Sequence, residues 1–198
     1  MSERRVRRKE LRPLEILDCA RAVFLARGYA KTTFDHIARE GDMARGTIYL
    51  YYKSKLEIFR ACLDRVVNEH KKILLELEIS SSLPFPERIS RLLSGFRRFF
   101  QEPECAGFIA IILSEGHENP ELLTSLSEVV LPRVTAQWQE LVEDCGFSSD
   151  YSKTVFLCLL WPFVLLSLSV RVSERTDAFL NLEKLEKNLQ EMVLRLLG

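Results

Sequence analysis

The side chains best suited to chemistry in this 198-residue chain gather in one short stretch, residues 45–55. Arginine can pair with guanine through two parallel hydrogen bonds, while threonine, tyrosine and lysine suit phosphate oxygens. Gly46 lies among such residues, although glycine costs about 1 kcal/mol relative to alanine inside a helix. The stretch therefore indicates a surface that contacts DNA. Gly46 indicates a place on it where a partner approaches the backbone closely. The donors of this stretch are Arg45, Thr47, Tyr49, Tyr51, Lys53 and Lys55.

Two short helical patterns would position these donors. Apolar residues at offsets of three and four predict a first helix over residues 34–40, with Thr32 or Thr33 as its N-cap. Gly-Asp-Met at 41–43 predicts a tight turn, and a second helix is predicted from Ala44 to about residue 52. Two helices joined in this way form a helix-turn-helix, whose second helix enters the DNA major groove. A helical hairpin with a solvated basic face also fits the pattern, and we favour DNA binding.

The same residues carry a resemblance to a known family. Gly28-Tyr29, Thr32-Thr33, Ile37-Ala38 and the run 45–55 resemble the N-terminal domain of TetR-family transcriptional regulators, over roughly residues 10 to 65. The resemblance implies an all-α homodimeric regulator of the repressor type, with a C-terminal domain for ligand binding and dimerisation. The DNA-binding residues that we expect are Thr32, Thr33, Arg45, Gly46, Thr47, Tyr49, Tyr51, Lys53 and Lys55.

One departure from the family pattern concerns the turn. The family usually has Ala-Gly-Val-Ser where this chain has Gly-Asp-Met-Ala over residues 41–44. Ala44 lacks the hydroxyl group that would cap the second helix or touch a phosphate. We therefore expect the usual contact at this position to be altered.

Charge is divided unevenly along a chain that is neutral as a whole. Residues 1–60 hold 14 Lys and Arg against 8 Asp and Glu, whereas residues 61–198 hold 14 against 20. A basic head on an acidic body is expected of a protein with an N-terminal DNA-binding domain. We predict a basic arm over 1–10, a three-helix helix-turn-helix domain over 11–60, and a larger helical effector-binding and dimerisation domain over 61–198. The arm could follow phosphates or the minor groove, or form a disordered tail.

The remaining helices are predicted from apolar periodicity. The helix from Lys55 to about Ile79 is the natural lever between the two domains, and Pro132 should kink the long helix that contains it. Residues 155–170 carry no charge, yet they are too few for a membrane span of about 20 residues. We expect this helix to be buried on most sides, and the resemblance implies that the two C-terminal helices form the homodimer. The predicted ranges are 13–27, 55–79, 86–101, 104–115, 119–145, 155–170 and 181–197.

An effector pocket is expected among the helices after residue 80. Its aromatic residues favour a small lipophilic effector, with Arg97, His117 and Gln137 as polar handles, although each aromatic also fits an ordinary core. The predicted pocket residues are Phe96, Phe99, Phe100, Phe108, His117, Trp138, Phe156 and Trp161, with Phe163 beside them.

Other functional classes find little support in the sequence. The five cysteines lack CxxC or Cys/His metal spacing, and no phosphate-binding glycine loop, GxSxG or HExxH motif is present. The run from Glu115 to Asn119 fits a polar turn better than a metal site. We therefore expect a cytoplasmic regulator, with no enzymatic activity, cofactor or metal, that binds a palindromic operator and is released by its effector. The alternative is a helical protein-interaction or membrane-surface module.

Overall fold

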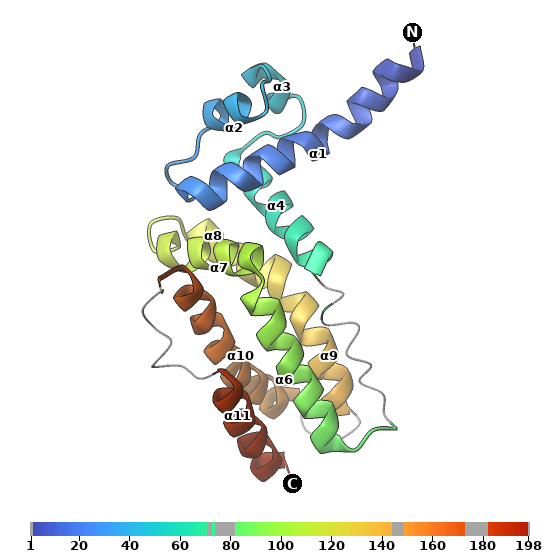
Figure 1. The fold of residues 1–198 in the computed structure, drawn as a ribbon, viewed down its shortest axis with the longest axis vertical. Helices are drawn as coiled ribbons and strands as arrows, with labels where there is room; N and C mark the ends of the chain where they lie inside the picture. The colour runs from blue at the N-terminus through green and yellow to red at the C-terminus, as the bar shows by residue number, and fades with distance from the viewer. Residues whose placement is uncertain (1, 71–72, 74–81, 144–148, 173–181, 198) are drawn as a thin grey trace.

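The computed structural model describes residues 2–70, 73, 82–143, 149–172 and 182–197. Every regular element in this described part is helical, which confirms the predicted all-α fold (Figure 1). The elements are α1 (Ser2–Arg27), α2 (Phe34–Glu40), α3 (Arg45–Tyr49), α4 (Lys55–His70), α6 (Phe85–Gln101), α7 (Pro103–Glu115), α8 (Pro120–Ser125), the π-helical segment η1 (Leu126–Val130), α9 (Leu131–Glu143), α10 (Ser149–Val172) and α11 (Leu182–Leu197).

The N-terminal end is a small bundle in which α1 packs on both α2 and α4. Its centre is formed by fully buried side chains from all three helices, among them Phe24, Ile37 and Phe59. Helix α1 starts at Ser2 rather than near Pro13, so the predicted separate arm is the first part of this helix (Figure 1). Arginine and lysine are good helix formers, and extending an existing helix needs no new nucleation step.

The larger part of the chain is organised around α7. Its residues 105–112 are all buried, which confirms the central position that its uniformly apolar sequence predicts. Helix α10 packs on α7 and α6, and α11 packs on α6. In Figure 1 α7 and α8 lie across the top of this part, below α1 and beside the lower half of α4.

The long helix predicted over residues 119–145 is divided in two. Helices α8 and α9 are joined by η1, in which the N–H group of Leu131 donates to the carbonyl of Leu126, one residue beyond the α-helical partner. Pro132 follows directly and has no N–H group to donate. The disturbance expected at Pro132 therefore takes the form of a π turn just before it. Residues 144–145 lie outside the described part.

Helix α4 connects the two parts, because it packs on α1 as well as on α7, α8 and η1. It is described as far as His70, so most of its predicted extension to residue 79 lies outside the described residues. The predicted domain boundary at residues 60 and 61 falls inside this helix. Within the described residues, no helix has the length and hydrophobicity needed to cross a membrane.

Candidate nucleic-acid interface

Helix α2 is fixed at its N-terminus by a reciprocal cap. Thr33 is the N-cap: the backbone N–H group of His36 donates to its hydroxyl oxygen at 3.3 Å. The N–H group of Thr33 in turn donates to His36 Nδ1 at 3.3 Å. Thr33 is exposed at the outer surface, where it remains a candidate phosphate contact.

The turn between α2 and α3 depends on two residues for different reasons. Asp42 takes the left-handed conformation, with φ of +43°. Gly41 leaves room for a close approach, since an added Cβ would overlap Met43 Cε and lie 2.9 Å from Cys19 Sγ. The N–H group of Met43 donates back to the carbonyl of Ala38 at 2.9 Å, which closes the turn.

Helix α3 is anchored on its inner side and open on its outer side. Ile48 is fully buried, and the ring of Tyr49 packs edge-on against Phe34 with centroids 4.6 Å apart. Ala44 is the N-cap and makes no side-chain hydrogen bond, as the missing hydroxyl group predicts. Anchoring by these inner contacts holds so short a helix in one orientation, which its five residues could not maintain alone.

Arg45 lies on the exposed face of α3 and already has partners there. Its guanidinium group donates to the Tyr49 hydroxyl at 2.9 Å and to Asp35 Oδ2 on α2 at 3.1 Å. The Tyr49 hydrogen bond first, and the Asp35 charge second, raise the pKa of Arg45. These two partners hold the side chain across the exposed face of α3.

Gly46 and Leu50 share the outward face one helical turn apart. A Cβ added at Gly46 would meet nothing within 4 Å, so the glycine is not needed for packing inside the protein. Leu50 is 80% exposed, although it is a large apolar residue. A leucine side chain can contact the methyl group of thymine in the major groove. Sequence reasoning missed Leu50, because only its placement at the end of α3 distinguishes it from a core leucine.

Two predicted contacts are engaged inside the protein instead. Thr32 is 1% exposed and its hydroxyl donates to the carbonyl of Gly28 at 2.6 Å. The Lys55 ammonium donates to the carbonyls of Tyr29 at 2.8 Å and Ala30 at 3.4 Å, and it lies 4.2 Å from the Tyr29 ring centroid. Partial burial lowers the pKa of Lys55. Both residues therefore hold the turn after α1, and direct contact of Thr32 and Lys55 with DNA stays a prediction.

The other predicted residues surround the end of α3. Lys53 is exposed, whereas Thr47 and Tyr51 are half-buried. Ser54 caps α4, because its hydroxyl oxygen accepts the N–H group of Glu57 at 3.1 Å. The Glu57 carboxylate accepts the N–H group of Lys53 at 2.7 Å, which fixes the backbone beneath the lysine.

The predicted effector residues do not form one group. Phe96, Phe156, Phe163 and Trp138 form a buried cluster, with ring centroids 5.8 to 6.2 Å apart. Phe99 and Phe100 are also buried and lie edge-on to each other. These rings are packed as a hydrophobic core, formed by α6, α9 and α10.

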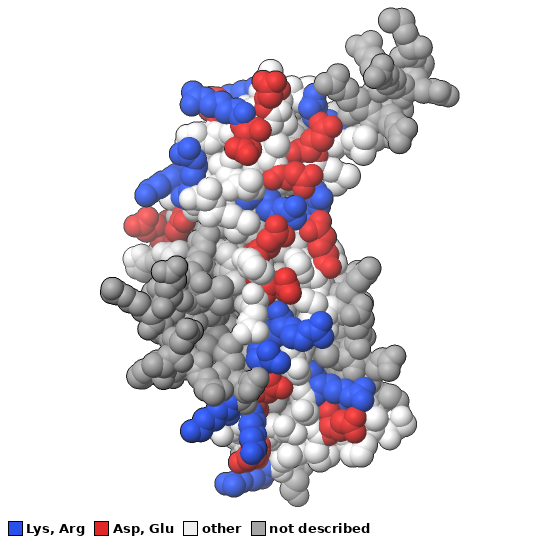
Figure 2. All heavy atoms as spheres, viewed as in Figure 1, with Lys and Arg blue, Asp and Glu red and all other residues white. Residues whose placement is uncertain are grey.

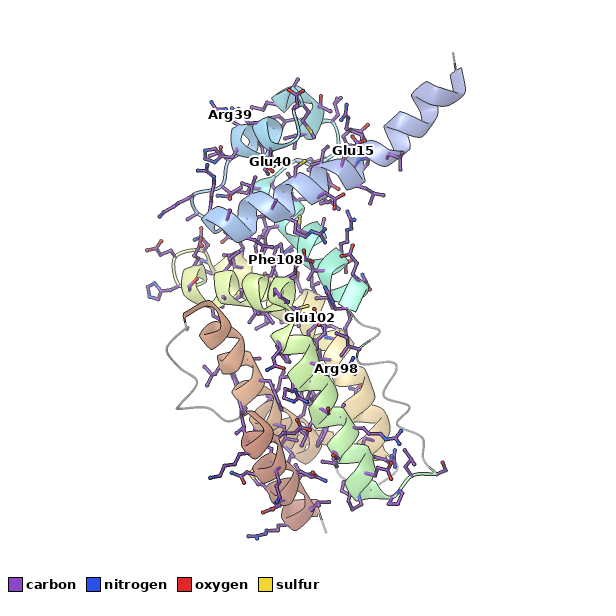
Figure 3. All side chains as sticks on the ribbon, in the orientation of Figure 1. Glu15, Arg39, Glu40, Arg98, Glu102 and Phe108 are labelled. Atoms are coloured by element: carbon purple, nitrogen blue, oxygen red, sulfur yellow. The ribbon has the colours of Figure 1, made fainter. Side chains whose placement is uncertain are left out.

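Three predicted pocket residues lie elsewhere. Phe108 contacts Phe59 of α4 with centroids 5.2 Å apart, at the junction with the N-terminal bundle (Figure 3). His117 is exposed in the turn after α7, and Trp161 is 48% exposed because its position on α10 faces away from the core. Arg97 is paired with Glu186 of α11 at 2.7 Å, while the side chain of Gln137 lies outside the described part. Among the described residues, no group of His, Cys, Asp and Glu is arranged to hold a metal ion.

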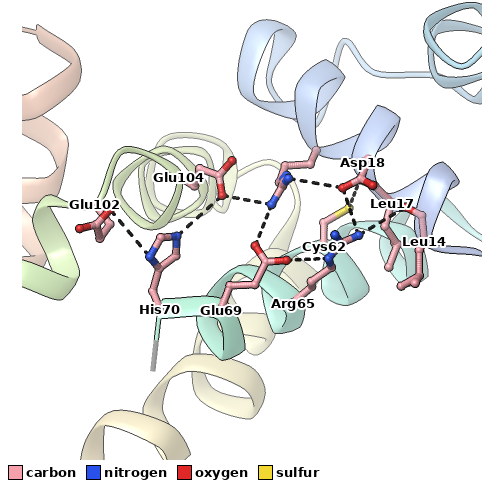
Figure 4. A network of polar contacts seen from close by, with 10 residues as sticks. Leu14, Leu17, Asp18, Cys62, Arg65, Glu69, His70, Glu102 and Glu104 are labelled. Atoms are coloured by element: carbon pink, nitrogen blue, oxygen red, sulfur yellow. Dashed lines mark hydrogen bonds and ion pairs between the residues drawn. The ribbon is translucent and has the colours of Figure 1, made fainter. Parts of the chain in front are cut away.

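Charged side chains connect the two parts of the molecule. Figure 2 shows acidic and basic groups alternating over the junction where α1 and α4 meet α7. Arg21 of α1 pairs with Glu69 of α4 at 2.9 Å and Glu104 of α7 at 3.2 Å, and His70 lies 3.7 Å from Glu102 and 3.8 Å from Glu104 (Figure 4). Partly exposed ion pairs of this kind are worth about 0–1 kcal/mol each, so they link α1, α4 and α7 but contribute little to the free energy of unfolding.

The capped α2, the tight turn and the anchored, outward-facing α3 define a helix-turn-helix protein. Residues 16–62 match the profile of the family described as bacterial regulatory proteins, tetR family. The chain is 34% identical over 119 residues to the uncharacterized HTH-type transcriptional regulator YhgD of Bacillus subtilis, a stretch that covers 60% of this chain and 59% of YhgD. It is 36% identical over 61 residues to the HTH-type transcriptional repressor BepR of Brucella suis, covering 31% and 29% of the two chains. Over its N-terminal part the chain is therefore similar to regulators of the TetR family.

A solved structure extends the similarity to the whole fold. The regulator FadR of Bacillus subtilis, crystallised in complex with stearoyl-CoA, superposes with a TM-score of 0.65 and 17% sequence identity. The match covers 91% of this chain and 96% of FadR. At this identity the comparison establishes the fold alone. The sequence matches span less than two thirds of YhgD and of BepR.

Proposed function

We propose that this protein is a transcriptional repressor that binds a palindromic operator as a homodimer through one α3 per subunit. The observation that carries the proposal is the two-sided construction of α3. The buried Ile48 holds its inner side, and the half-exposed ring of Tyr49 packs against Phe34 of α2, while Arg45, Gly46 and Leu50 are exposed. Such an arrangement suits insertion into a major groove. The similarity to BepR, which is named as a transcriptional repressor, supports repression as the direction of regulation.

A dimer through the C-terminal helices is supported by the outer face of α10. Leu157, Trp161 and Leu165 recur every four residues and are 45%, 48% and 58% exposed. One apolar stripe on a helix without intervening charge is typical of a surface that packs against another helix. A second copy of this chain would place the same stripe opposite itself, as two-fold symmetry requires.

The effector is proposed to be a small lipophilic molecule that enters beside the Phe96–Phe156–Trp138 cluster. Aromatic walls favour apolar ligands, and the similar fold of FadR was solved with stearoyl-CoA. Effector binding would change the spacing of the two α3 helices. A repressor of this kind would act in the cytoplasm, where the chromosome lies.

The first experiment is a selection from random duplex DNA with the full-length protein at near-physiological salt. We expect an enriched inverted repeat, whose two-fold symmetry reports the dimer. Arg45→Ala should then relax the sequence preference, because each bidentate base contact contributes about 1–3 kcal/mol of discrimination. Arg98→Ala is the matched control, since Arg98 is an exposed arginine on α6, away from α3 (Figure 3).

The competing function is a protein-interaction module that uses the apolar face of α10. It predicts no enriched sequence and an association that changes little with salt. Binding to DNA instead weakens steeply as salt rises, because each neutralised phosphate releases counterions. Equal loss of affinity for operator and random DNA in Arg45→Ala would remove Arg45 from base recognition.

A further inference from the structure

The turn that leads from α1 into α2 is held by a carboxylate from the other part of the molecule. Glu115 is the last residue of α7. Its Oε1 accepts the backbone N–H group of Tyr29 at 3.1 Å, and its Oε2 accepts that of Ala30 at 2.6 Å. A carboxylate with one amide on each oxygen fixes both the distance and the direction of the turn, because hydrogen bonds to a charged group are short and strong.

Gly28 makes this approach possible. Its φ is +79°, and a Cβ added there would overlap Oε1 of Glu115. The glycine is therefore required twice, by the backbone conformation and by the space that the carboxylate fills. Any residue with a Cβ at position 28 would overlap the Glu115 carboxylate. This contact is therefore tightly packed, in contrast to the ion pairs of Arg21 and His70.

The opposite side of the same turn is held by α4. Lys55 donates to the carbonyls of Tyr29 and Ala30, whose N–H groups face Glu115. The turn is thus clamped between an anion on α7 and a cation on the helix that follows α3. A shift at the end of α7 is transmitted to the start of α2 and, through Lys55, to the start of α4.

The position of Glu115 in its own helix points to the same role. A negative charge in the last turn of a helix is repelled by the negative end of the helix dipole, so the Glu115 carboxylate does not stabilise α7 itself. Two residues before the helix end, Leu113 is packed against the core, so the end of α7 cannot move alone. The hydrogen bonds of the carboxylate come from the amide groups of the α1–α2 turn, and the nearby positive charge of Lys55 also stabilises it.

We propose that Glu115 is the positioning residue through which α7 sets the orientation of the helix-turn-helix relative to the rest of the subunit. This inference rests on the proposed function, because orientation matters only when two α3 helices must match two half-sites. Breaking the contact leaves the exposed face of α3 intact in each subunit. It allows the two α3 helices of the dimer to adopt other separations.

The test compares operators that differ only in the spacing of their half-sites. Glu115→Gln keeps the size of the side chain but replaces one acceptor oxygen with a donor and removes the charge. We expect its preference for the selected spacing over a spacing altered by one base pair to fall about tenfold, within the usual range of coupling between sites. Its affinity for a single half-site should stay close to that of the wild type. Glu118→Gln, an exposed glutamate three residues on, is the charge-matched control and should behave as the wild type.

Two results would overturn the inference. One is an unchanged spacing preference in Glu115→Gln. The other is an equal loss of affinity for single half-sites and for both spacings, which would mean that the contact only stabilises the N-terminal bundle. Failure of the wild type to select any DNA would refute the proposed function separately.

Amide hydrogen exchange tests the contact without DNA. The N–H groups of Tyr29 and Ala30 should be protected in the wild-type protein, since both donate to Glu115. In Glu115→Gln both should exchange faster, while the amide of Phe24, in the last turn of α1, stays unchanged. Exchange of the Ala30 amide at the rate of an unstructured chain in the wild type would show that the contact does not form.

Discussion

Substituting alanine for Gly46 should change stability and DNA binding in opposite directions. In the free protein the new methyl group meets no heavy atom within 4 Å, so it introduces no strain. Alanine is favoured over glycine by about 1 kcal/mol in a helix interior, and the ends of so short a helix reduce this to roughly 0.5–1 kcal/mol. For a chain of this size, that gain corresponds to a melting temperature about 1–4 °C higher.

Binding should weaken because the same methyl group lies on the face that meets DNA. The group would hold α3 away from the groove and lengthen several hydrogen bonds at once. Each bidentate contact to a base is worth about 1–3 kcal/mol, so the loss of a single one already lowers affinity about tenfold. The expected result is a more stable protein that binds its selected operator about tenfold more weakly.

Thermal unfolding and a binding titration at fixed salt measure the two effects in the same preparation. Ser114→Ala is the control, because it raises helix propensity at an exposed position of α7, remote from α3. It should raise stability without changing affinity. A Gly46→Ala protein with unchanged operator affinity would refute the idea that the backbone approaches DNA there, and a destabilised one would refute the structural account of this glycine.

Three further changes test other features of the structure. Ala44→Ser should add the missing N-cap of α3 and raise the unfolding free energy by about 1 kcal/mol, measured by urea denaturation; an unchanged value would mean that the serine makes no cap. Trp161→Asp should convert the dimer to monomers in sedimentation experiments, because a charge would replace the centre of the apolar stripe on α10; a retained dimer would place the interface elsewhere. Stability should fall as the pH rises from about 9 towards 12, because burial raises the pKa of Cys62 to about 12 and that of Tyr29 to about 12, above their ordinary values of 9.0 and 10.0. A group with a raised pKa binds its proton more tightly in the folded protein. Its contribution to the free energy of unfolding is therefore complete below the unfolded pKa and is lost as the pH rises through the folded pKa. Cys62→Ala should reduce this alkaline slope, as followed by denaturation at several pH values, and an identical slope would assign the loss to other groups.

The helix-turn-helix could be predicted from the sequence because local signals determine it. Ser54 and the Gly41-Asp42 turn act on neighbouring residues, and their effects depend little on the rest of the chain. The apolar residues of α7 also predict its central place, since a helix without a polar face has to be buried. Periodicity and capping are sufficient for such features.

The sequence leaves open the surroundings of a side chain where only the folded structure determines them. Lys55 looks like a phosphate contact, yet its ammonium group finds two carbonyls some 25 residues earlier. Thr32 and Thr33 look interchangeable as caps, and only the fold decides which hydroxyl faces inward. Trp161 resembles its aromatic neighbours in composition, but its helical phase places it on the outer face of α10.

The π turn at Leu126–Val130 has a consequence for the tolerance of the chain to insertions and deletions. The extra residue of a π turn is absorbed within that one wider turn, so α8 and α9 keep the phase of a single regular helix on either side of it. Deleting one residue there should restore an α-helix while Ser125 keeps its hydrogen bond to Arg60, now at 3.1 Å. A deletion in the regular turns of α9 would instead rotate the flanking residues by about 100°, so the chain should tolerate the loss of a residue better within this segment than beside it.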